Sequence, residues 1–168
     1  MKEEKKRFNF GNNWKQYLKS LDNQKINSSK ECLLDFLGVE DLKDKKFLDV
    51  GSGSGLSSLV GKIAGAEVYS FDYDEESVAC TKYLKHKYYP DDPKWNIAQG
   101  SALDSKYLES LGKFDIVYSW GVLHHTGNMY QALELVEQNV AENGKLFISL
   151  YNDQGFTSEF WLTIKKAY

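Results

Sequence analysis

The sequence predicts an α/β protein with an open, mostly parallel sheet and helices on both faces of that sheet. Two observations lead to this fold class. Short, mostly apolar runs alternate with helix-forming stretches over residues 47–151, as expected for strands that are buried on both faces. One of these runs also ends in a turn with glycine at every second position, and a helix-forming stretch follows at once. This connection is typical of a strand and the crossover helix behind it.

Two helical patterns precede the first expected strand. The first runs roughly over residues 13–21, where apolar side chains recur at the spacing of one helix face. The second follows Asn27 and Ser28, which we expect to cap its first turn. Gly38 is expected to end this second helix.

Strands and helices then alternate. The expected strands are residues 47–50, 67–71, 95–98, 114–119 and 145–151, and the expected helices lie near residues 56–64, 75–87, 128–140 and 157–168. In open sheets of this kind, ligands bind beyond the carboxyl ends of the strands, where the strand order reverses. Polar side chains fall at or just after four of the expected strand ends, which predicts a ligand site on that rim: Asp49, Asp72, Ser101 and Ser119.

Composition limits the classes of partner. The formal net charge of the 168-residue chain is −3, so no basic face for nucleic acid is expected. No apolar run is long enough to span a membrane, and no signal peptide is recognised. Cys32 and Cys80 are far apart and have no metal-ligand spacing, so we expect two buried thiols in a reduced, cytoplasmic protein.

The glycine turn over residues 51–55 discriminates between ligand classes. Glycine lets the backbone turn sharply and lets a ligand approach without meeting a Cβ atom. The dinucleotide fingerprint needs glycine at its first, third and sixth positions, and the sixth position counted from Gly51 is Leu56. No Gly-Lys-Ser/Thr follows, so a phosphate-binding P-loop is also excluded. Asp49 precedes the turn, and its carboxylate suits an ammonium or sulfonium group rather than a pyrophosphate.

Residues 49–55, Asp-Val-Gly-Ser-Gly-Ser-Gly, resemble the first motif of class I S-adenosylmethionine-dependent methyltransferases. Four further segments in the expected order are similar to later motifs of that family: residues 68–72, 99–104, 114–125 and 143–148. The resemblance covers residues 47–151, and it implies a Rossmann-like sheet and S-adenosylmethionine as the cofactor. The sequence of residues 118–127 also resembles that of a bacterial subgroup with no defined substrate.

The resemblance implies a set of cofactor-binding residues. The methionine end of the cofactor would be lined by Asp49, Gly51, Ser52 and Gly53, and the ribose would be held by Asp72. The adenine would be contacted by Tyr73, Ser101 and Ala102. The sulfonium and the substrate entrance would be flanked by Ser119 and Trp120. Many relatives carry an acid in place of Ser101, and a serine hydroxyl accepts the adenine amino group more weakly. Two alternatives stay open: Asp72 could cap the following helix, a role for which Asp74 competes, and Trp120 could pack in the core.

The adjacent residues His124 and His125 are the candidate catalytic pair. A histidine can act as a general base near neutral pH. In the family that this chain resembles, however, a histidine here often only shapes the start of the next helix. No run of acids follows the fourth expected strand, so we expect no metal site.

The resemblance implies methyl transfer to a small-molecule acceptor. Enzymes that methylate amino groups of adenine or glutamine typically carry Asn/Asp-Pro-Pro-Tyr/Phe after the fourth strand, whereas this chain has Ser-Trp-Gly-Val over residues 119–122. A general base is needed only if the acceptor atom keeps a proton at neutral pH. The alternative is a cofactor-binding module without turnover that acts through a partner or as a dimer.

Two expectations concern the ends of the chain. Residues 1–40 are expected as an N-terminal helical lid segment and residues 41–168 as the methyltransferase core of one structural domain, although residues 14–17 could instead pack on the sheet. The family's sheet normally has seven strands, and we find no sequence for the last two. A sheet of five strands would leave an open edge, which we expect a second copy or another partner to cover.

Overall fold

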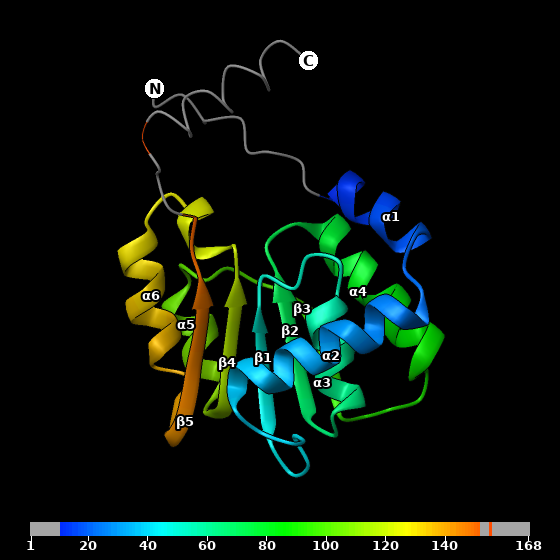
Figure 1. The fold of residues 1–168 in the computed structure, drawn as a ribbon. Coiled ribbons are helices and arrows are strands. Elements are labelled where there is room, and N and C mark those ends of the chain that lie inside the picture. Colours follow the sequence, from blue (N-terminus) through cyan, green and yellow to red (C-terminus); the bar gives the residue numbers. More distant parts are fainter. Residues whose placement is uncertain (1–10, 152–154, 156–168) are drawn as a thin grey trace.

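The structure is a computed structural model that describes residues 11–151 and 155. Helices α1 (Gly11–Lys19) and α2 (Asn23–Leu37) precede an alternation of strands and helices (Figure 1). The strands are β1 (Lys46–Val50), β2 (Glu67–Asp72), β3 (Trp95–Gln99), β4 (Phe114–Trp120) and β5 (Val140–Ser149). The helices among them are α3 (Leu56–Ile63), α4 (Glu75–Tyr88), α5 (Ser105–Leu111), the 3-10 turn η1 (Leu123–His125) and α6 (Met129–Glu137).

The described residues form one five-stranded sheet in the order β3-β2-β1-β4-β5, and all neighbouring strands are parallel. The predicted fold class is therefore confirmed. The chain adds β2 and β3 on one side of β1 and then returns to place β4 on its other side. The strand order thus reverses between β1 and β4, which makes their carboxyl ends the expected ligand site.

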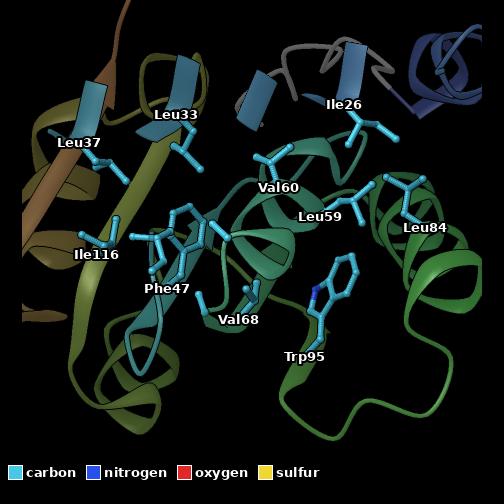
Figure 2. Packing of buried hydrophobic residues seen from close by; sticks show 13 residues of the cluster. Ile26, Leu33, Leu37, Phe47, Leu59, Val60, Val68, Leu84, Trp95 and Ile116 are labelled. Carbon is cyan, nitrogen blue, oxygen red and sulfur yellow. The ribbon is translucent and has the colours of Figure 1, made fainter. Parts of the chain in front are cut away.

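Two apolar layers cover the sheet. Helices α2, α3 and α4 bury one face in a cluster that includes Leu33, Leu59 and Leu84 (Figure 2). Helices α5 and α6 cover the other face, around Leu108 and Val136. Strands β1, β2, β4 and β5 supply both layers, because successive side chains of a strand point to opposite faces.

The start of α2 differs from the prediction. Its N-cap is Asp22, whose carboxylate accepts a hydrogen bond from the Lys25 backbone at 2.8 Å, so the predicted cap at Asn27 and Ser28 is wrong. The earlier start allows Ile26 to join the buried face of the helix. The predicted end at Gly38 is confirmed by its left-handed backbone conformation.

Three further elements differ from expectation. Helix α5 was not predicted, and Asp104 caps it by accepting from the backbone of Tyr107 at 3.1 Å. Helix α6 ends before Asn139, whose side-chain amide donates to two carbonyls near the end of α5, so β5 begins earlier than predicted.

Cys80 is buried as expected, whereas Cys32 is exposed. The predicted helix over residues 157–168 lies outside the described residues.

Among the described residues, the helices are too short or too polar to cross a membrane. The same part of the chain contains no cluster of three or more potential metal-ligating side chains.

Candidate cofactor site

The glycine turn connects β1 to α3 at the reversal point of the sheet. The backbone N–H groups of Gly51 and Ser52 both donate to the carbonyl of Phe71, at 2.9 and 3.0 Å, and so fasten the turn to the end of β2. Gly51 has a φ of 76°, and a Cβ atom built on it would lie 2.4 Å from the side chain of Val122. Only glycine fits here, because the backbone needs a positive φ and the loop after β4 lies against it.

Asp72 fastens the same turn from the end of β2. One carboxylate oxygen accepts from the backbone of Gly53 and the other from the backbone of Asp74, each at 2.9 Å. Asp74, rather than Asp72, caps α4 by accepting from the backbone of Glu76. Burial raises the pKa of Asp72, and the two backbone hydrogen bonds oppose this shift. Each oxygen of this carboxylate retains a lone pair that can accept a hydroxyl group.

Asp49 lies inside the protein rather than on the rim, with only 2% of its surface exposed. The Ser58 hydroxyl of α3 donates to its carboxylate at 2.5 Å. Burial raises the pKa of Asp49 to about 7; the Ser58 hydrogen bond opposes this shift, and the charge of Asp72 adds to it. The carboxylate of Asp49 therefore lies beneath the glycine turn and close to that of Asp72, and not on the rim itself.

The predicted adenine-contacting residues lie beyond the ends of β2 and β3. The Gly100 backbone donates to the Asp72 carbonyl at 3.0 Å, which places Ser101 and Ala102 next to the ribose-binding candidate. The Ser101 hydroxyl accepts from the Leu103 backbone at 3.2 Å, and Ala102 is buried. The side chain of Tyr73 is 60% exposed.

The two residues at the end of β4 point in different directions. Ser119 is buried, and its hydroxyl donates to the Val50 carbonyl at 3.1 Å, so it joins β4 to β1 beneath the rim. Trp120 is 51% exposed and stacks against Phe147 with ring centroids 5.9 Å apart. Trp120 therefore lies at the surface of the rim against Phe147, so the alternative of a core position is wrong.

His124 and His125 lie in η1, between β4 and α6. Their ring centroids are 4.0 Å apart, and the ring of Tyr151 lies 4.4 Å from that of His124. Burial lowers the pKa of both histidines. Among the described residues, neither ring nitrogen of His124 has a hydrogen-bond partner, although both are buried. Burial thus favours the neutral imidazole, and within residues 11–151 its acceptor nitrogen has no hydrogen-bond donor.

Helix α1 packs against α4 and the first apolar cluster, and its Trp14 reaches the glycine turn. The Trp14 ring lies 3.1 Å from the position that a Cβ atom on Gly53 would take. An ion pair between Lys15 and Glu76 fastens α1 to α4, and a groove of about 370 Å³ remains between these two helices. The sequence did not reveal that Trp14 contacts Gly53, because this contact joins residues far apart in the chain.

The fold and this rim together define a Rossmann-like α/β domain with a nucleotide-cofactor site at the carboxyl ends of β1, β2 and β4. The chain belongs to the methyltransferase domain family, whose model matches residues 25–162.

Curated relatives share part of their length with this chain. The chain is 29% identical over 147 residues to a ribosomal protein L11 methyltransferase of Helicobacter hepaticus. The aligned region covers 84% of this chain and 41% of the relative. It is 26% identical to a histidine protein methyltransferase 1 homolog of Dictyostelium discoideum, over 71% of this chain and 40% of the relative. The chain thus spans about two fifths of the length of these relatives.

Solved structures share the fold. An S-adenosyl-L-methionine-dependent methyltransferase of Methanococcus maripaludis superposes with a TM-score of 0.68 at 20% identity, over 99% of this chain and 75% of its own. Magnesium protoporphyrin IX methyltransferase of Synechocystis, with bound S-adenosylhomocysteine, gives 0.64 at 20% identity, over 86% of this chain and 62% of its own.

Proposed function

We propose that this protein transfers a methyl group from S-adenosylmethionine to a small-molecule acceptor. The observation that carries the proposal is the pair of carboxylates, Asp49 and Asp72, on either side of the glycine turn. Two negative charges beside this turn repel a pyrophosphate and favour a cofactor with ammonium and sulfonium groups. The methyltransferase family match supports the same assignment.

The rim offers a fitting group for each part of the cofactor. We assign the ribose hydroxyls to the free lone pairs of Asp72, since a carboxylate accepts more than the two bonds that the backbone makes. We assign the adenine to the space beside Tyr73, Ser101 and Ala102, and the methionine end to the turn at Gly51 and Gly53. Trp14 of α1 is the lid over that end.

Methyl transfer requires the acceptor atom, the methyl group and the sulfur in one line, away from water. The bound cofactor supplies the reactive methyl group. In this chain, Trp14 and Trp120 would exclude water on two sides of the rim. We propose His124 as the general base, with His125 supporting its ring, for an acceptor that carries a proton.

A cofactor-binding test with S-adenosylhomocysteine examines the first part of the proposal. Isothermal titration calorimetry should show binding to the folded protein, and Asp72→Ala should weaken it by about 1–3 kcal/mol, because two hydroxyl-to-carboxylate hydrogen bonds are lost. Asp104→Ala is a matched control, since this carboxylate caps α5. Absence of binding to folded wild-type protein would overturn the proposal.

The acceptor class needs a separate test. The relatives are named for a ribosomal protein and for protein histidine, and one structural neighbour for a porphyrin. We favour a small molecule for two reasons. Residues 119–122, Ser-Trp-Gly-Val, lack the Asn/Asp-Pro-Pro-Tyr/Phe motif that is typical of enzymes acting on amino groups of adenine or glutamine. The net charge of −3 also gives no basic surface for nucleic acid. Transfer of labelled methyl groups should reach the metabolite fraction of a cell extract, and label found only in protein would contradict this choice.

The alternative is a cofactor-binding module without turnover. Binding of S-adenosylhomocysteine without transfer to any fraction of the extract would support this alternative.

A further inference from the structure

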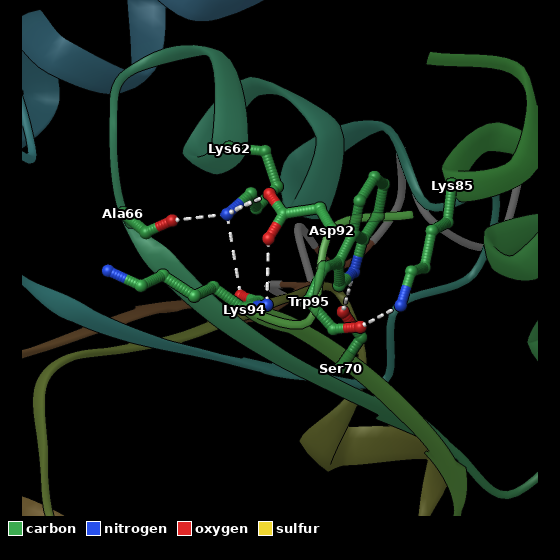
Figure 3. A network of polar contacts seen from close by, with 7 residues as sticks. All are labelled: Lys62, Ala66, Ser70, Lys85, Asp92, Lys94 and Trp95. Carbon is green, nitrogen blue, oxygen red and sulfur yellow. Dashed lines mark hydrogen bonds and ion pairs between the residues drawn. The ribbon is translucent and has the colours of Figure 1, made fainter. Parts of the chain in front are cut away.

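A chain of buried polar side chains crosses the otherwise apolar layer beneath the glycine turn. The Trp95 indole N–H on β3 donates to the Ser70 hydroxyl on β2 at 3.0 Å. Ser70 and Ser58 share a hydrogen bond of 2.7 Å, and Ser58 donates to Asp49 at 2.5 Å. All four side chains are at most 2% exposed, and Figure 3 shows the Trp95 nitrogen directed at Ser70.

With Asp49 ionised, chemistry fixes the direction of every hydrogen bond in this chain. An indole N–H can only donate, so the Ser70 oxygen accepts from Trp95. The single hydroxyl proton of Ser58 goes to Asp49, so Ser58 accepts the proton of Ser70. Three donors in series therefore point to one carboxylate, and such bonds polarise one another in the same sense.

A protonated Asp49 does not fit this arrangement. If the bonds kept their direction, the O–H of the neutral acid and the O–H of Ser58 would point at each other. If instead Asp49 donated to Ser58 and Ser58 donated to Ser70, the hydroxyl proton of Ser70 would have no acceptor among these four side chains. A buried donor without an acceptor costs free energy. The geometry thus favours the carboxylate form of Asp49 over the neutral acid.

We propose that Trp95, Ser70 and Ser58 form a one-way positioning network that keeps Asp49 ionised and so sets the affinity of the rim for a cationic cofactor. The proposal rests on the proposed function, because it takes the cofactor to be cationic. The three residues touch neither cofactor nor acceptor and act through Asp49.

The charged and titratable groups around Asp49 make such a network necessary. Asp72 on β2 carries a charge of the same sign and raises the pKa of Asp49, as does burial. From β4, the phenol of Tyr118 faces the same region, and burial together with the charge of Asp49 raises its pKa to about 12. The charge of Cys32 on α2 also raises the pKa of Tyr118. Against these effects, the hydroxyl of Ser58 and, more weakly, its backbone N–H lower the pKa of Asp49 and so favour its ionised form.

The first experiment measures the ionisation of Asp49 directly, without cofactor. Carboxyl carbon NMR should give a higher pKa for Asp49 in Ser58→Ala than in wild type, by about one unit for one lost hydrogen bond to a charged group. Trp95→Phe should raise it by less, because Ser58 still donates. Ser77→Ala is the control, since Ser77 is buried and donates to Asp74 instead. An unchanged Asp49 pKa in both Ser58→Ala and Trp95→Phe would overturn the proposal.

The second experiment follows S-adenosylhomocysteine affinity between pH 6 and pH 9. If the Asp49 pKa rises by one unit from about 7, Ser58→Ala should bind about fivefold more weakly than wild type at pH 7 and almost equally at pH 9. A merely structural role would weaken binding equally at every pH and would count against the network. Failure of wild type to bind at any pH would overturn the proposed function, whereas the carboxyl titration would still decide the network.

Discussion

His124 is the residue whose surroundings most favour a chemical role. Both ring nitrogens are buried and have no hydrogen-bond partner among the described residues, and burial lowers the pKa. A base must be neutral to accept a proton, so a lowered pKa keeps it active under mildly acidic conditions.

We therefore predict the pH dependence of transfer to the acceptor identified by labelling. The value of kcat/KM should rise with pH through the pKa of His124, which lies below the usual value near 6.5, so wild type keeps more than half of its plateau at pH 6.5. His124→Gln should lower kcat/KM about 10²-fold or more and remove this acid limb. His125→Gln is the matched control and should retain the fall of kcat/KM at acidic pH. If His124→Gln left kcat/KM and its pH dependence unchanged, both histidines would have only a structural role in η1.

At this scale, the sequence identified the residue types but not their orientations. Asp49 was correctly placed near the end of β1, yet its side chain points to Ser58 inside the protein, because alternation along the strand selects its face. Ser119 follows the same rule and bonds to Val50. The serines at positions 58 and 70 interrupt apolar stretches of a buried helix and strand, and this was the available signal for the network.

At the level of elements, a buried lysine fastens α3 to the loop before β3. Lys62 Nζ lies 2.8 Å from the Asp92 carboxylate and donates to the Ala66 carbonyl at 2.9 Å (Figure 3). From α4, Lys85 donates to the Trp95 carbonyl at 2.6 Å. These bonds hold the first residue of β3, so they also fix the position of the indole that begins the network to Asp49.

We predict that Asp92→Asn lowers the free energy of unfolding by about 2 kcal/mol at pH 7, because Lys62 stays buried without its counter-charge. The hydrogen bond from Lys62 lowers the pKa of Asp92 in the folded state. The stabilisation is therefore present above the unfolded pKa near 3.9 and disappears as pH falls through the lower folded pKa.

Urea unfolding at pH 7 and at low pH measures both effects. The exposed pair of Asp41 and Lys43 provides the control, and Asp41→Asn should cost less than about 1 kcal/mol. Equal losses for the two variants at pH 7 would show that the Lys62 ion pair has no special contribution.

Helices and strands with a clear hydrophobic pattern were predicted close to their observed bounds, whereas elements with a weak pattern were missed or misplaced. Strands β1 to β4 and helices α3 and α4 lie within one or two residues of their predicted bounds. Helix α5 has only seven residues, too few for a clear helical period. The last strand was predicted to begin at Lys145, whereas Asn143 and Gly144 already lie within β5, where its pairing with β4 is irregular.

At the scale of the whole molecule, β5 is one of the two edges of the sheet among the described residues, the other being β3, and it pairs with β4 alone. Beside it, an aromatic patch is formed by Phe36, Trp120 and Phe147, with Phe36 57% exposed. An open edge next to exposed apolar rings favours association with a second copy or another partner. Within residues 11–151, this side of the sheet therefore combines the β5 edge with exposed aromatic rings.

We predict that the protein self-associates in a concentration-dependent way through this side of the molecule. Size-exclusion chromatography with light scattering should give a mass that rises above 19.3 kDa with concentration for wild type, and Phe36→Ser should shift it toward the monomer. Tyr83→Ser removes an equally exposed ring from α4 and should leave association unchanged. A monomeric wild type across the whole concentration series would contradict self-association, since burial of these rings drives it.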